Sequence, residues 1–196
     1  MGDRTAKIVR KTKETDIVCE INIDGTGKSD ISTGVGFFDH MLTAFARHGF
    51  FDLTLKCKGD LEVDSHHTIE DCGIALGQAI YEALKDKAGI ARYGCFTLPM
   101  DETLMVCAVD LCGRPYLNFD VRLTTPRVGY FDTEMAKEFF YAVSYSAMMN
   151  LHIKELAGEN NHHKLEACFK AFAKAMDMAT KYDDRIEGAL STKGVI

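Results

Sequence analysis

The sequence lacks a hydrophobic run as long as the roughly 18 apolar residues that a membrane helix needs. Its beginning is also unlike a signal peptide, because an apolar stretch is missing and charged residues are frequent there: Asp3, Arg4, Lys7, Arg10 and Lys11. We therefore expect a cytoplasmic protein that makes no contact with a membrane.

The sequence also lacks an excess of positive charge and a cysteine pattern typical of disulfides. Its formal net charge is −6, whereas proteins that bind nucleic acid neutralise phosphates with clustered Lys and Arg. The 7 cysteines are odd in number, scattered and mostly flanked by apolar residues, which is typical of buried, reduced thiols rather than of disulfides or a CxxC zinc site. We expect no nucleic-acid partner, and an anionic ligand would need a local basic pocket.

Apolar residues, in contrast, make up 46% of the 196 residues, which is enough for a sizeable core. Alternating apolar residues predict strands within 6–23, with Glu14 at the bend between them, and a strand over 50–57. Helical spacing predicts a helix from 34 to about 48 and others from 66 and 162 onward. Further strands are expected at about 95–98, 103–110 and 115–121.

Two helix-like segments open on a pair of histidines followed by a glutamate. In each, the first histidine and the glutamate are four residues apart and share a helix face, whereas the second histidine points about a quarter turn away. The residues are His66, His67 and Glu70 in the first motif, and His162, His163 and Glu166 in the second. A single copy could arise by chance. Two copies predict two metal sites, each combining the His-x-x-x-Glu pair of one motif with the second histidine of the other.

The motifs close two copies of a longer repeat. Residues 35–39 (VGFFD) recur as 128–132 (VGYFD), and 52–56 (DLTLK) recur as 150–154 (NLHIK). This order predicts an α+β fold made by tandem duplication of a half-domain, with halves at 1–88 and 89–196. Each half is expected to be a mostly antiparallel sheet with two helices on one face.

The repeat breaks at two histidines. His40 aligns with Thr133, and His152 aligns with Thr54, so each half carries one additional histidine at a different place. Alone, either would more often be an ordinary structural residue. Beside the two motifs, each is a candidate fourth ligand.

Long, ordered motifs cover nearly the whole chain: GVGFFDHML (34–42), GDLEVDSHHTIEDCGIALGQA (59–79), RYG (92–94), PMDETL (99–104), DLCGRPY (110–116), NLHI (150–153), NNHHKLEACFKAFAKA (160–175) and STKG (191–194). In these the sequence resembles the imidazoleglycerol-phosphate dehydratases. It resembles their monofunctional form, because 196 residues leave no room for the phosphatase domain of some relatives.

The resemblance implies a manganese-dependent lyase that converts imidazole glycerol phosphate to imidazole acetol phosphate in histidine biosynthesis. It also implies two manganese ions in a site between subunits of a large homo-oligomer, with 24 subunits. By resemblance, the ligands of one ion are His40, His67, His162 and Glu166, and those of the other are His66, Glu70, His152 and His163.

The family's substrate residues map onto Arg92, Arg114, Lys170 and the run Ser191, Thr192 and Lys193, which places the tail 188–196 in the substrate site. Glu14 is implied as the catalytic acid/base. The chain departs from the family at Cys112, where Ser is usual, and at Leu190, where Pro is frequent. Neither departure is a proposed ligand.

The chemistry needs an electron source, because the proton is lost from a carbon with no neighbouring carbonyl. If two ions hold both ring nitrogens, the substrate's ring becomes an imidazolate that can expel the adjacent hydroxyl, while Glu14 moves the protons. Two other functions fit the same His and Glu set: a dinuclear metallohydrolase, and a metal-binding oligomer without catalysis.

Overall fold

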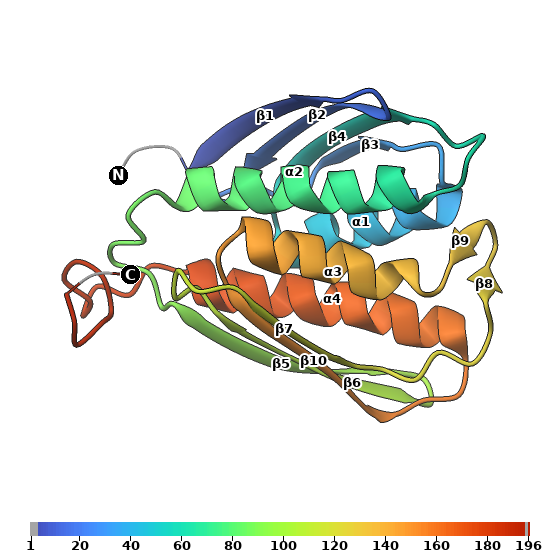
Figure 1. Ribbon diagram of the computed structural model, residues 1–196. Helices are drawn as coiled ribbons and strands as arrows, with labels where there is room; N and C mark the ends of the chain where they lie inside the picture. Colours follow the sequence, from blue (N-terminus) through green and yellow to red (C-terminus); the bar gives the residue numbers. More distant parts are fainter. Residues whose placement is uncertain (1–3, 195) are drawn as a thin grey trace.

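A computed structural model describes residues 4–194 and 196, and there it places four helices between two four-stranded sheets (Figure 1). No helix in these ranges is long and apolar enough to cross a membrane. The first unit contains β1 (Thr5–Lys11), β2 (Thr15–Asn22), β3 (Ser29–Ser32), α1 (Gly36–Gly49), β4 (Asp52–Gly59) and α2 (His66–Leu84). The second contains β5 (Tyr93–Met100), β6 (Thr103–Asp110), β7 (Tyr116–Asp120), β8 (Arg127–Val128), β9 (Phe131–Asp132), α3 (Met135–Ser146), β10 (Asn150–Ala157) and α4 (Asn161–Thr180).

The two sheets have the same topology. Their strand orders are β1-β2-β4-β3 and β5-β6-β10-β7. In each sheet the last pair, β3 with β4 and β7 with β10, is parallel, and the other pairs are antiparallel. The fold is therefore α+β with a duplicated half-domain, as the repeat predicted. The exact boundary between 88 and 89 stays a prediction.

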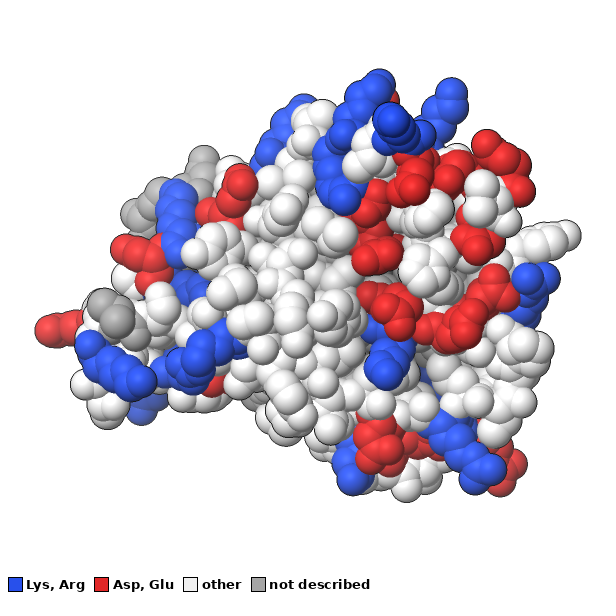
Figure 2. Space-filling view, in the orientation of Figure 1, with Lys and Arg blue, Asp and Glu red and all other residues white. Residues whose placement is uncertain are grey.

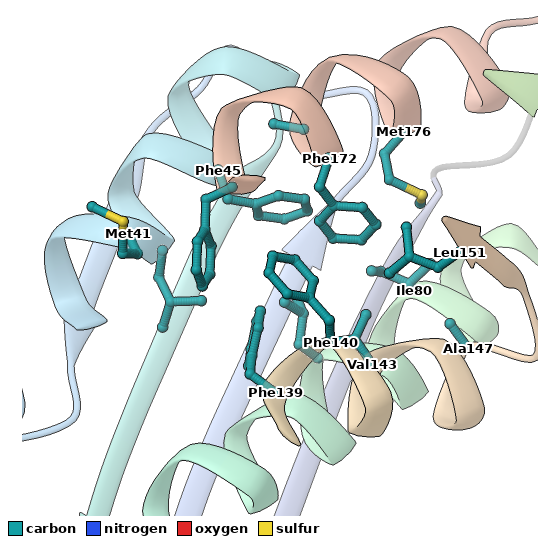
Figure 3. Packing of buried hydrophobic residues seen from close by; sticks show 14 of the residues in the cluster. Met41, Phe45, Ile80, Phe139, Phe140, Val143, Ala147, Leu151, Phe172 and Met176 are labelled. Atoms are coloured by element: carbon teal, nitrogen blue, oxygen red, sulfur yellow. The ribbon is translucent and has the colours of Figure 1, made fainter. Parts of the chain in front are cut away.

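Each sheet buries one face against its own helices, as the alternating burial along β2 and β6 requires. Helix α2 covers β1 and β2, and α4 covers β5 and β6, while α1 packs on α4 and α3 packs on α2 across the two units. Figure 3 shows the aromatic rings that meet between these helices. The ring centroids of Phe140 and Phe172 are 5.6 Å apart, and those of Phe45 and Phe172 are 5.2 Å apart. One continuous core therefore fixes the four helices relative to one another.

The letter match between 35–39 and 128–132 does not extend to structure. In the first unit the helix begins at Gly36, so His40 lies inside it. In the second unit the matching residues form the β8–β9 hairpin, and α3 begins only at Met135. Thr133 precedes that helix, and its hydroxyl donates to the carbonyl of Thr125 at 2.6 Å. His40 and Thr133 therefore correspond only in the sequence alignment, because His40 lies inside α1 and Thr133 lies before α3.

Gly73 and Gly77 of α2 allow the close approach of α3. A Cβ on Gly77 would lie 2.7 Å from the carbonyl oxygen of Val143 and 2.7 Å from the Cβ of Ser146. Overpacking a tight contact costs about 1–3 kcal/mol, more than the roughly 1 kcal/mol that Ala gains in helix propensity. We expect Gly77→Ala to lower the midpoint of thermal unfolding.

Gly36→Ala is the matched control, because a Cβ on this helical glycine would meet nothing within 4 Å. It is expected to be neutral or to stabilise by about 0.4–1 kcal/mol. Equal unfolding temperatures for the two variants would contradict the proposed contact.

Candidate metal and substrate site

The two histidine motifs form the first turns of α2 and α4, as predicted. Asn160 caps α4, and its side chain accepts from the backbone N–H groups of His162 at 2.9 Å and His163 at 3.4 Å. At the start of α2, the carboxylate of Asp64 accepts from the backbone N–H of His66 at 2.7 Å. Such caps satisfy backbone N–H groups that have no partner within the helix, and they fix the position of the first turn that carries each motif.

One three-residue cluster with the donor types of a metal site forms between α1 and α4. The Nε2 atoms of His162 and His40 lie 3.1 Å and 3.7 Å from Oε2 of Glu166. All three ligand atoms lie within 4.8 Å of one another, and within the described ranges no other group of His, Cys, Asp and Glu meets this criterion. Imidazole and carboxylate together suit divalent transition metals, including manganese.

Glu166 is ionised in this setting. Burial raises its pKa, but the contacts with Lys170, His162 and His40 outweigh burial and hold the pKa below its ordinary value. The ammonium of Lys170 lies 2.6 Å from Oε1 of Glu166. Lys170, which the resemblance assigns to substrate binding, therefore lies beside the metal cluster in the single chain.

The other ligand candidates of α2 lie on two sides of the helix start. Nε2 of His66 is 3.4 Å from Oε2 of Glu70, as the four-residue spacing predicted. His67 points elsewhere: its Nε2 is 3.7 Å from Oε1 of Glu14, and its Nδ1 is 3.0 Å from Oδ2 of Asp60. Within one chain, His67 does not join His40, His162 and Glu166.

His163 is held in the same manner by residues of the β5–β6 turn. Its Nδ1 is 2.8 Å from Oε2 of Glu102, and its Nε2 is 3.7 Å from Oδ2 of Asp101. The hydrogen bond that His163 makes to Glu102 raises the pKa of His163, just as the bond that His67 makes to Asp60 raises the pKa of His67. Sequence reasoning missed Asp60 and Glu102. The only signal was the pairing of hairpins, which places Asp101 and Glu102 where the first half has Glu14.

His152 lies on the outer face of the second sheet. Its neighbours in β10, Leu151 and Ile153, are buried toward the helices, so the exposed His152 points the other way and contacts the ring of Tyr116, with centroids 5.5 Å apart. The second sheet therefore separates His152 from His66 of the same chain.

A basic cavity of about 770 Å³ lies beside the C-terminal segment. Its lining includes most of the residues assigned to phosphate: Arg92, Arg114, Ser191, Thr192 and Lys193, together with Arg185. Arg92 is already paired, with Nε 2.7 Å from Oδ1 of Asp110, and its Nη1 donates to the carbonyl of Leu190 at 2.7 Å. Arg92 therefore anchors the segment that presents Ser191 and Lys193.

Figure 1 shows the C-terminal segment beyond the last turn of α4, at the opposite end from the first turns of that helix. The cavity is lined by that segment, and the metal cluster includes His162 and Glu166 of the first turns, so the two lie at opposite ends of α4. The backbone N–H of Arg92 donates to the carbonyl of Ala179 in the last turn of α4, at 2.9 Å. Glu166 lies near the other end, about 20 Å away along the axis at a rise of about 1.5 Å per residue. Figure 2 shows acidic side chains gathered at the end where α2 begins, and Lys and Arg side chains beside the C-terminal segment at the other end.

Comparisons with known proteins identify the family of the chain. The family model described as imidazoleglycerol-phosphate dehydratase matches residues 33–176. The protein of that name from Lachnoclostridium phytofermentans is 67% identical over 99% of both chains, and the one from Acetivibrio thermocellus is 59% identical over 99% of this chain and 100% of the relative.

Solved structures agree as well. The crystal structure of imidazoleglycerol-phosphate dehydratase from Staphylococcus aureus is 42% identical, with a TM-score of 0.83 over 91% of this chain and 99% of that one. The structure of IGPD from Pyrococcus furiosus is 40% identical, with a TM-score of 0.84 over 96% and 100%. The chain therefore belongs to the imidazoleglycerol-phosphate dehydratase family, the lyases that dehydrate imidazoleglycerol phosphate in histidine biosynthesis.

Proposed function

We propose that the chain dehydrates imidazole glycerol phosphate to imidazole acetol phosphate with two bound manganese ions, in sites that several subunits of a large cytoplasmic homo-oligomer complete. The observation that carries this proposal is the separation of about 20 Å along α4 between the metal cluster and the turn that holds Arg92. The substrate carries its ring and its phosphate on one glycerol chain, whose few bonds of about 1.5 Å each cannot span that distance. Ring and phosphate therefore need residues from different copies of the chain.

The donor set fits two manganese ions. Each proposed set contains three imidazoles and one carboxylate, which leaves two positions of an octahedral ion open. One set is His40, His67, His162 and Glu166, and the other is His66, Glu70, His152 and His163. When bound, the ions would supply Lewis-acid chemistry to the substrate's imidazole ring.

The protein's own groups would then move the protons. The hydroxyl next to the ring leaves, a proton leaves the neighbouring carbon, and the resulting enol becomes the ketone. Glu14 is suited to this transfer because it lies in the β1–β2 turn with its side chain 52% exposed and one oxygen 3.7 Å from Nε2 of the proposed ligand His67. A carboxylate so placed can reach a substrate held beside His67.

A turnover assay tests the function. Manganese-loaded protein with imidazole glycerol phosphate should form a ketone that keeps its phosphate. Release of inorganic phosphate would instead indicate a metallohydrolase, and bound metal without any turnover would indicate a metal-binding oligomer.

The phosphate residues can be tested separately from the metal. Lys193→Ala or Arg114→Ala should weaken substrate binding about 10- to 100-fold, because one charge-assisted contact is worth on the order of 1.5–3 kcal/mol. Both residues line the cavity beside the C-terminal segment, and neither contacts the metal cluster. Manganese content should therefore stay unchanged. Substrate affinity and manganese content are measured on the same sample.

Lys181→Ala is the matched control. Lys181 follows α4 at the same end of the molecule, but it pairs with Asp177 at 3.5 Å and does not line the cavity. Binding as tight in Lys193→Ala and Arg114→Ala as in Lys181→Ala would remove the two residues from the substrate site.

A further inference from the structure

Two carboxylates outside every motif contact the second histidines of the two motifs. Glu102, in the turn between β5 and β6, meets Nδ1 of His163 at 2.8 Å. Asp60, in the segment after β4, meets Nδ1 of His67 at 3.0 Å. In both cases the carboxylate takes the Nδ1 side of the ring and leaves Nε2 as the atom that can bind a ligand.

The two oxygens of Glu102 have different partners. Oε1 accepts from the backbone N–H groups of Asn160 at 2.8 Å and Glu159 at 3.1 Å, and from the hydroxyl of Thr103 at 3.1 Å. Oε2 faces His163. One side chain therefore holds the segment that leads into α4 and also holds the ring of the histidine in the first turn of that helix.

Glu102 acts as an acceptor in this setting, because its Oε1 already takes bonds from two backbone N–H groups and one hydroxyl. Nδ1 of His163 is therefore the donor of the bond to Oε2. A neutral imidazole that donates from Nδ1 carries its lone pair on Nε2, which is the form that a metal ion needs.

We propose that Glu102 and Asp60 are positioning residues, which fix the ring direction and the Nδ1–H tautomer of His163 and His67 so that each Nε2 is ready to bind manganese. This inference rests on the proposed metal role of the two histidines. The arrangement occurs in both halves but uses different elements, a turn between strands in one and the segment before a helix in the other. It is therefore not a simple copy left by the duplication.

Glu102→Gln separates positioning from a purely structural role. Two backbone N–H groups point at Oε1, so the amide oxygen must take that place, and the amide NH2 then faces Nδ1 of His163. The anchor of the α4 start is kept, but the bond to the ring is reversed. His163 is driven to the Nε2–H tautomer, which cannot bind a metal through Nε2.

Manganese-loaded Glu102→Gln is titrated with a chelator, and released Mn²⁺ is followed by electron paramagnetic resonance. Loss of an outer partner of a metal ligand typically lowers metal affinity about 10- to 100-fold, and we expect this loss for one of the two ions. The midpoint of thermal unfolding of the metal-free protein should not change. Affinity equal to wild type in this variant would overturn the proposal.

Two further variants control for charge and for folding. Glu159→Gln removes an equal charge from an exposed side chain beside Glu102, and it should keep wild-type affinity. If it lost as much affinity as Glu102→Gln, the effect would be one of net charge, and the proposal would be wrong. Asp60→Ala removes the acceptor of His67 and breaks no other hydrogen bond described for the Asp60 side chain. It should lower the affinity for the manganese ion that His67 is proposed to bind.

His163→Ala distinguishes a failure of the positioning role of Glu102 from a failure of the metal role of His163. Loss of one ion in His163→Ala, with full affinity in Glu102→Gln, would leave the metal site in place and reject only the positioning role. Retention of both ions in His163→Ala would reject the metal role of His163 itself.

Discussion

Glu14→Gln is expected to lower turnover about 100- to 10,000-fold while the metal content stays at the wild-type level, because a positioned general acid/base is typically worth that much in rate. Gln keeps the shape of the side chain and can still accept a hydrogen bond, but it cannot take up or release a proton. Glu14 lies 3.7 Å from His67 through Oε1 and belongs to no proposed ligand set. Loss of rate without loss of metal is therefore the specific signature of a proton carrier.

The measurement is turnover at saturating imidazole glycerol phosphate and manganese, with metal content determined on the same sample. Asp16→Asn provides the control on the same hairpin, because Asp16 is similarly exposed but bonded to Lys11 at 2.6 Å. It should retain near wild-type turnover. The same result for Glu14→Gln would exclude Glu14 as the proton carrier and would direct attention to a metal-bound water.

The fold was predictable from the sequence where local patterns repeat. Helix spacing located α2 and α4, strand patterns located β2, β4 and β6, and the duplicated order predicted two equivalent sheets. The match of 35–39 with 128–132 failed because five letters do not determine an element. In the second unit, the β8–β9 hairpin is inserted before the helix can begin at Met135.

The site was predictable to the same extent. The pairs His66–Glu70 and His162–Glu166 follow from helix geometry alone, and the structure places both as expected. The addition of His40 to the second pair came from a break in the repeat, which is a weaker signal. The structure brings His40 within 3.7 Å of Glu166.

The contacts of Asp60 with His67 and of Glu102 with His163 could not be predicted from residue spacing. Glu102 is 61 residues from His163 in sequence. A hydrogen bond over such a separation depends on how the β5–β6 turn reaches the start of α4, and that arrangement is set by packing of the core. No spacing rule describes it, whereas a helix fixes the distance between residues four apart.

Removal of manganese by a chelator is expected to lower turnover at least about 100-fold and to break the oligomer into smaller species. Metal ions stabilise a transition state by several kcal/mol, and each 1.36 kcal/mol is tenfold in rate. The effect on assembly follows from His152. It points away from the helices on the outer face of the second sheet, so it can reach an ion held by His66 and Glu70 only when these belong to another subunit. An ion bound by several copies stabilises the assembly by mass action.

His152→Ala tests this link without a chelator. It should reduce the mass measured by light scattering at low protein concentration, even with manganese present, because one of the ions loses its ligand from the neighbouring subunit. His48→Ala is the control, since His48 lies on α1 and belongs to neither proposed ligand set. If chelator-treated protein and His152→Ala both kept the wild-type mass, contacts other than the metal would hold the subunits together. The proposed sharing of ligands between subunits would then lose its support.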